Sequence, residues 1–255
     1  MTPIESRLFQ LQELREYKVV KANELIQRSR FSLTAQEHKI ISYLISKIKP
    51  DDYEFHLFEF KIGEFCEVCG IDHVNGKNYI NLKSTIKKLS DKSLWVKSDD
   101  GKKEILFRWV DDAVIDYQNG TVLMKINERM KSFLLQVKEK FTQYGLYYTL
   151  PMKSQYSMRL YELFKSWEYI GWWRAEVEEL KRNLFAETYK RYPDFKRKVI
   201  DTAIRETNVY GDINVSYTVE KRGNKVTHIV FQIKTKTDIL ERAQTYAKID
   251  EVLNK

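Results

Sequence analysis

Residues 193–208, PDFKRKVIDTAIRETN, form the stretch that decides the fold of this chain. They predict one helix, because Pro193 suits the first helical position, where its fixed φ fits and its missing N–H needs no partner. At 100° per residue, the apolar side chains fall on one side: Phe195, Val199, Ile200, Ala203 and Ile204. The polar side chains fall on the other side: Arg197, Lys198, Asp201, Arg205 and Asn208. The apolar side must be buried against a domain, so the polar side faces something else.

The first turn of this helix carries three consecutive cations, Lys196, Arg197 and Lys198. The N-terminal end of a helix is already electropositive, so cations there cost the helix a little stability. A cationic run in this place indicates an external anion, and phosphate is the obvious candidate. A second interpretation is a solvated charged face in which Arg197, Asp201 and Arg205 pair at i, i+4 spacing. This helix alone leaves both interpretations open.

The composition limits the class of protein. The chain has 255 residues, of which 43% are hydrophobic and 31% charged, as in ordinary folded domains. Its 44 Lys and Arg against 36 Asp and Glu give a formal charge of +8, which favours a polyanionic partner. No apolar run approaches the roughly 18 residues of a membrane span, and the first residues lack the apolar core of a signal peptide. We therefore expect no membrane partner, and the two cysteines indicate a reducing cytoplasm.

The order of predicted elements repeats along the chain. The first half contains a helix that begins at Thr34, where Glu37 completes a capping box. Further elements are predicted there: helices at 62–69, from Lys77 and at 128–137, and strands at 17–21, 53–60, 104–109, 114–117 and 121–126, with a turn at Asn119-Gly120. The second half is predicted to contain helices from Ser154, at 176–184 and at 193–208, and then a hairpin of strands 212–219 and 226–233.

Each half thus has helices followed by a β-hairpin, which is typical of a winged helix, where the last helix enters a major groove and the hairpin touches the adjacent backbone. The predicted fold class is α+β: two tandem winged-helix domains, each a helical bundle with a β-hairpin wing. The expected divisions are a tail at 1–16, a first domain at 17–140, a second domain at 141–237 and a helix or tail at 238–255. The role of residues 1–16 stays open between a packed tail, a dimer contact and a frayed end.

Five sequence blocks occur in an order that resembles a known family: 19–25 (VVKANEL), 33–44 (LTAQEHKIISYL), 157–163 (SMRLYEL), 194–200 (DFKRKVI) and 225–231 (KVTHIVF). The chain resembles, over about residues 17–235, the bacterial plasmid replication initiators that bind repeated origin sequences called iterons. The resemblance implies that the second domain reads the major groove and that the first grips backbone and contributes to dimerisation. It also implies monomers that initiate at direct repeats, dimers that repress their own gene at an inverted repeat, and a host initiator and a replicative helicase as partners.

The chemistry of the site residues fits this resemblance. A guanidinium can bind guanine O6 and N7 together, so Arg197 and Arg205 are the candidates for base contact. Asp201 lies between them and is expected to hold either guanidinium or to accept from a cytosine amine. The remaining candidate DNA contacts are Lys196, Lys198, Asn208, the wing residues Lys221, Arg222 and Lys225, and Lys77, Lys83 and Lys87 of the first domain. The lysines and Arg222 would neutralise phosphates without reading sequence, although the wing tip also suits a plain surface turn.

Several other signals are better interpreted as structural. Cys66 and Cys69 form a CEVC pair, but no second pair completes a zinc site, so core thiols are expected. The glycine-containing loop at 70–78 departs from a phosphate-binding loop in spacing and ends on Asn78. Sixteen tyrosines suggest a nicking enzyme, yet the four histidines are scattered and form no metal-binding pair.

The leading hypothesis is therefore an initiator without enzymatic activity, cofactor or metal. The alternative is a winged-helix transcriptional regulator without an initiation role.

Overall fold

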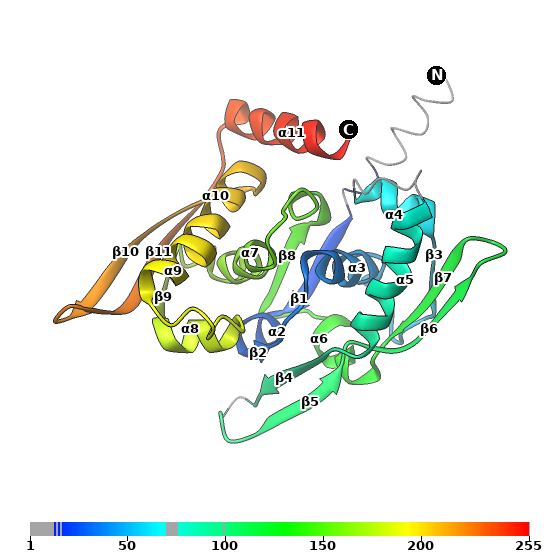
Figure 1. Ribbon diagram of the computed structural model, residues 1–255, viewed down its shortest axis with the longest axis horizontal. Coiled ribbons are helices and arrows are strands. Elements are labelled where there is room, and N and C mark those ends of the chain that lie inside the picture. Colours follow the sequence, from blue (N-terminus) through cyan, green and yellow to red (C-terminus); the bar gives the residue numbers. More distant parts are fainter. Residues whose placement is uncertain (1–12, 14, 16, 70–75, 99, 255) are drawn as a thin grey trace.

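The structure is a computed structural model that describes residues 13, 15, 17–69, 76–98 and 100–254, with the backbone alone described at 76–80. Most of the predicted tail at 1–16 and the loop at 70–75 lie outside the described residues. Two units stand side by side, with the strands β1 and β8 between them (Figure 1).

The first unit is a winged helix. It contains the helices α3 (Ala35–Ser46), α4 (Ile62–Val68) and α5 (Gly76–Ser90) and the strands β3 (Phe58–Lys61), β6 (Val110–Asp116) and β7 (Thr121–Ile126). The sheet order is β3-β7-β6, so the second hairpin strand is central. The predicted capping box is present at α3, because Thr34 and Glu37 each accept a hydrogen bond from the other's backbone N–H.

The second unit repeats this plan. It contains α7 (Gln155–Trp167), β9 (Trp172–Glu176), α8 (Val177–Asn183), α9 (Tyr192–Phe195), α10 (Asp201–Tyr210), β10 (Ile213–Arg222) and β11 (Lys225–Thr235). Its sheet order, β10-β11-β9, again places the second hairpin strand in the centre. In both units a short strand leads without a gap into the middle helix, β3 into α4 and β9 into α8. The predicted pair of winged helices is confirmed.

One hairpin in the first unit has no counterpart in the second. Strands β4 (Ser93–Lys97) and β5 (Glu104–Arg108) pair with each other and with β2 (Ser29–Arg30). The predicted wing strand at 104–109 therefore belongs to this inserted hairpin, and β7 pairs with β6 instead. Strands β4 and β9, five residues each, were not predicted, and β3 is shorter than the strand predicted at 53–60.

Segments from both ends of the first 150 residues meet between the units. Strand β1 (Lys18–Ala22) pairs antiparallel with β8 (Phe141–Gly145), and α2 (Asn23–Arg28) follows β1. The predicted helix at 128–137 is shorter, a 3-10 turn at Glu128–Met130 and then α6 (Lys131–Leu134). The proposed domain boundary at residue 140 falls just before β8.

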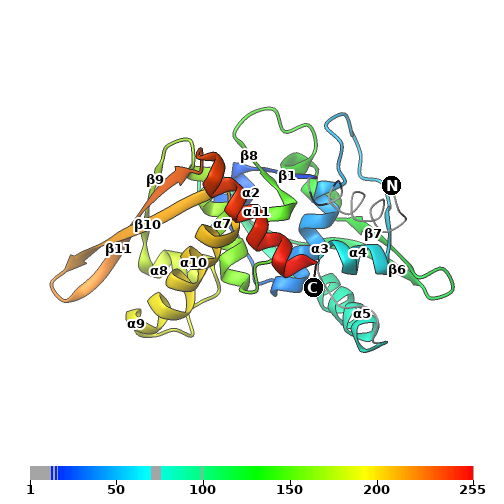
Figure 2. The ribbon, with the colours of Figure 1, turned by 90° about the horizontal axis from the view of Figure 1, so that it is seen from above.

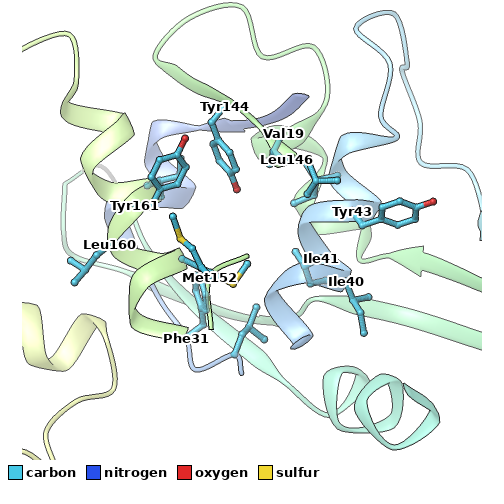
Figure 3. Packing of buried hydrophobic residues seen from close by; sticks show 14 of the residues in the cluster. Val19, Phe31, Ile40, Ile41, Tyr43, Tyr144, Leu146, Met152, Leu160 and Tyr161 are labelled. Carbon is cyan, nitrogen blue, oxygen red and sulfur yellow. The ribbon is translucent and has the colours of Figure 1, made fainter. Parts of the chain in front are cut away.

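The core is continuous across both units. In Figure 3, Tyr144 and Tyr161 lie between α7 and α3, with their ring centroids 5.4 Å apart. Val19 and Leu146 fill the space toward Ile41, and all five side chains are at most 2% exposed.

A cluster of buried charges sits at this junction. Glu162 of α7 binds Lys21 of β1, lies 3.3 Å from His38 Nε2 of α3, and accepts from the Tyr144 hydroxyl at 2.5 Å. Arg159 lies 3.7 Å from the same carboxylate and donates to the Ile26 carbonyl at 2.6 Å. Burial opposes ionisation of Glu162, but the surrounding cations hold the pKa of its carboxyl well below its ordinary value. The two units therefore share an ionic core as well as an apolar one.

The C-terminal segment is a helix, α11 (Ile239–Leu253), which crosses from α10 toward the first unit (Figure 2). Asp238 caps its N-terminus by accepting from the Glu241 N–H. At its other end Arg15, which is 3% exposed, donates to the carbonyls of Glu67 and Leu253. Tyr147 adds a hydrogen bond of 2.8 Å to Asp250.

Candidate nucleic-acid interface

The predicted recognition helix is continuous, but it is not a regular α-helix. Between α9 and α10 lies a π-helical segment, Lys196–Ile200, here called the π-turn. The Asp201 N–H donates to the Lys196 carbonyl, five residues back. The Arg197 carbonyl accepts instead from the Thr202 hydroxyl at 3.2 Å. Relative to a regular α-helix the π-turn contains one extra residue. A helical wheel drawn at 100° per residue assumes that there is no such residue, so it could not predict the π-turn.

The apolar side of this helix is buried as predicted, with a shift at its C-terminal end. Phe195, Val199, Ile200 and Ala203 are all 0% exposed. Ile204 is only partly buried, and Thr207 takes the fully buried place one turn on. The helix packs chiefly on α7, and its opposite side faces away from the core.

The exposed side of the helix presents cations. The Arg197 side chain is 70% exposed, and its nearest partner is Asp194 at 3.5 Å. Lys198 and Arg205 are exposed as well, and the structure shows no hydrogen bond or ion pair between Arg205 and another described side chain. Their exposure leaves these groups accessible to an external anion.

Asp201 has a different role from the expected one. Its carboxylate binds Lys196 Nζ at 2.7 Å and the Tyr217 hydroxyl of β10 at 2.8 Å, so it holds neither Arg197 nor Arg205. The hydrogen bond to Asp201 raises the pKa of Lys196 above its ordinary value. The structure thus corrects the expectation that Asp201 steadies an arginine or meets a cytosine amine. Asp201 instead pairs with Lys196 and, through Tyr217, ties the helix to the wing.

Asn208 is also engaged internally. Its amide oxygen accepts from the Val215 N–H at 2.7 Å, and its amide nitrogen donates to the Val215 carbonyl at 3.0 Å. Because both ends of the amide are satisfied by β10, we leave Asn208 out of the candidate interface. The sequence could not predict this pairing, because a single asparagine near a helix end does not indicate which backbone groups its amide will bind.

The second wing is long and basic at its tip. Strands β10 and β11 run beside α9 and α10 and then extend beyond them (Figure 1). Lys221, Arg222 and Lys225 are exposed around the turn, where Gly223 adopts a φ of +60°. Below the tip, Arg174 of β9 binds Glu220 through contacts of 2.7 and 3.1 Å, which neutralises the one acidic group of the hairpin.

Two of the three candidate cations of the first unit, Lys83 and Lys87, lie among the described side chains. Lys87 of α5 is 80% exposed and lies 3.4 Å from Asp91. Lys83 is exposed, and its ammonium lies 5.1 Å from the centre of the Tyr117 ring at the first wing. The side chain of Lys77 lies outside the described residues. The first wing itself, residues 110–126, holds three aspartates and one lysine, an acidic balance that is already visible in the sequence.

The two cysteines are core residues, as predicted. Cys66 and Cys69 are each 1% exposed, and burial raises the pKa of their thiols to about 11 and about 12. Within the described parts of the chain, no three His, Cys, Asp or Glu side chains gather where a metal ion could bind. No helix among the described residues is long and apolar enough to cross a bilayer.

A helix–turn–helix that ends in a cationic helix and a basic wing defines the class of winged-helix DNA-binding proteins. Residues 18–165 match the family described as "Initiator Replication protein, WH1", and residues 176–233 match "Initiator Rep protein, WH2". The chain belongs to this family of plasmid replication initiators. Its members are DNA-binding initiators rather than conventional enzymes.

Known proteins agree with this assignment. The chain is 26% identical over 231 residues to an Escherichia coli "Replication initiation protein", covering 86% of this chain and 70% of that protein. It is 34% identical over 123 residues to the Escherichia coli "PI protein", covering 42% of this chain and 40% of that protein. A crystal structure of domains 2 and 3 of RctB has the same fold, with a TM-score of 0.50 and 13% identity over 82% of this chain and 86% of that one.

Proposed function

We propose that this protein initiates plasmid replication by binding direct repeats in its origin with α9 and α10 in the major groove, and that this binding nucleates opening of the duplex. The observation that carries the proposal is the exposed side of the recognition helix, where Arg197 and Arg205 project beside a basic wing. Family membership supports the same role.

The residues divide between reading and anchoring. Arg197 and Arg205 reach base edges, because a guanidinium matches guanine O6 and N7. Lys198 and the three cations of the wing tip neutralise phosphates and fix the position of the helix, whereas Lys196 is already paired with Asp201. Lys83 and Lys87 of α5 add contacts to backbone from the first unit. Binding then depends steeply on salt, since each neutralised phosphate releases counterions.

A dimer in equilibrium with the monomer represses the gene of the protein at an inverted repeat. The inserted hairpin of the first unit supports such an assembly. Trp95 and Leu106 are cross-strand neighbours on its open side, and they are 38% and 49% exposed. Strand β5 is an edge strand, and an apolar edge is suited to pairing with a second copy. A host initiator and the replicative helicase are the proposed partners of the DNA-bound monomer.

A transformation assay tests this function against that of a regulator. A marker without its own origin is joined to the gene and its flanking DNA. We expect the marker to persist with the intact gene and to be lost when Arg197 and Arg205 are both changed to alanine. Loss of the marker with the intact gene, while the protein still represses its own promoter, would identify a regulator instead.

A further inference from the structure

The π-turn changes which side chains of the recognition helix lie in line. In a regular α-helix, residues eight apart differ by about 80° around the axis. One inserted residue delays the rotation by about 100°, so the same pair across a π-turn differs by only about 20°. Buried side chains follow this altered spacing, since Phe195 and Ala203 are eight apart and both 0% exposed. Arg197 and Arg205 are also eight apart, and both are exposed.

Side chains from two elements fasten the π-turn. Lys196 and Asp201 join its two ends through a contact of 2.7 Å, and Tyr217 of the wing holds Asp201 from the side at 2.8 Å. In a regular α-helix the Asp201 N–H would bond the Arg197 carbonyl, but here it bonds the Lys196 carbonyl, and the Thr202 hydroxyl donates to the Arg197 carbonyl. A carbonyl left without a donor would favour return to the regular α-helical pattern.

We infer that the π-turn determines base specificity by bringing Arg197 into line with Arg205 on the groove-facing side, and that Thr202 is the residue that positions it. The inference rests on the proposed function and extends it. With one of the eight residues inserted, about seven regular steps of 1.5 Å, or roughly 10 Å, separate Arg197 and Arg205 along the helix axis. With base pairs about 3.4 Å apart, they reach positions about three base pairs from each other. In a regular helix Arg197 would turn toward the groove wall and meet phosphate alone.

The experiment measures base preference by selection from a duplex library in which each position of the repeat is randomised. Arg197→Ala and Arg205→Ala should each relax preference at one position, the two positions lying about three base pairs apart. Each should weaken binding to the repeat by about 5- to 150-fold with little effect on random duplex.

Thr202→Val is the decisive variant, because it keeps the shape of the side chain and removes the hydroxyl. It should weaken preference at the Arg197 position and leave the Arg205 position intact. Thr202→Ser keeps the hydroxyl and should restore the profile. Thr218→Val, on the exposed side of β10, makes the same change away from the π-turn and serves as the matched control. Circular dichroism establishes that each variant is folded.

The outcomes separate the inference from the function on which it rests. An unchanged base profile in Thr202→Val, or a uniform loss of affinity for all duplexes in Arg197→Ala, would overturn the role of the π-turn. If the wild-type chain itself prefers no sequence, then the proposed function fails first. Relaxed preference at the Arg197 position in Thr202→Val, with the Thr202→Ser profile unchanged, supports the inference.

Discussion

The two wings of this molecule share a topology and differ in charge. Residues 213–235 of the second hairpin contain four Lys and Arg and one Glu, whereas residues 110–126 of the first contain three Asp and one Lys. In the first wing Asp111 accepts from Asn127 at 2.5 Å, and Asp116 accepts from the N–H of Gln118 at 2.8 Å. These carboxylates shape the hairpin and would repel a phosphate backbone.

The contrast shows that two units with one fold can carry wings of opposite charge. Both units keep the strand that leads into the middle helix and the hairpin that completes the sheet. Only the second adds a basic tip and an arginine row to this frame. The first unit adds the β4–β5 hairpin instead, with its exposed apolar side chains. The sequence predicts that the first domain contacts the DNA backbone. In the first unit, α5 is the element that carries the candidate lysines for that contact.

The largest expected effect concerns the junction that the two units share. Glu162→Gln leaves Lys21 buried without a counter-charge, which should reduce the free energy of unfolding by about 3–5 kcal/mol. Urea titration measures this change, and Glu179→Gln on the surface of α8 should cost less than about 0.5 kcal/mol. A loss below about 1 kcal/mol for Glu162→Gln would mean that the ionic core does not join the units.

The same carboxylate predicts a pH dependence. Because the folded pKa of Glu162 lies well below its ordinary value, its stabilising contribution is full above the unfolded pKa of about 4.3. The contribution is lost as the pH falls through the folded pKa. Urea titrations at a series of acidic pH values should show the wild-type chain losing its advantage over Glu162→Gln.

The second wing gives the next largest effect. Changing Lys221, Arg222 and Lys225 together to alanine should lower the salt slope of DNA binding by about 2.7 units. At 0.15 M salt this corresponds to roughly a hundredfold loss of affinity, the same for repeat and random duplex. Fluorescence anisotropy across a salt series measures the slope. An unchanged slope would mean that the tip is a plain surface turn.

A smaller effect is expected where wing and helix meet. Tyr217→Phe removes the hydroxyl that donates to Asp201 and should cost about 0.5–1.5 kcal/mol of folding stability. Tyr169→Phe, at a fully exposed tyrosine, is the control and should change nothing. Equal stability of the two variants would show that the wing does not brace the helix.

The smallest effect sharpens the contrast between the wings. Asp112→Lys places a cation on the exposed first wing, where we expect no change in DNA affinity. A rise in the salt slope by about one unit would show that this wing reaches DNA after all, since one added phosphate contact gives about that increment.

Elements whose own residues carry a strong local signal could be predicted from the sequence. The capped helix at Thr34, the long hairpin and the two-sided helix at 193–208 carry local signals, and the structure has all three. The short strands β4 and β9 were missed because five residues give weak periodicity. The roles of Asp201 and Asn208 depend on partners in β10, which no local pattern reveals. The π-turn departs from 100° per residue, the spacing from which the two faces of this helix were predicted.

The central claim is that the second unit reads a base sequence through Arg197 and Arg205. Its most direct test is the ratio of affinities for the origin repeat and for a shuffled duplex of equal length, at one salt concentration. We predict a ratio of roughly a thousand or more for the wild-type chain and a steep fall when both arginines become alanine. A ratio near one for the wild-type chain, or no change in the double variant, would contradict the claim.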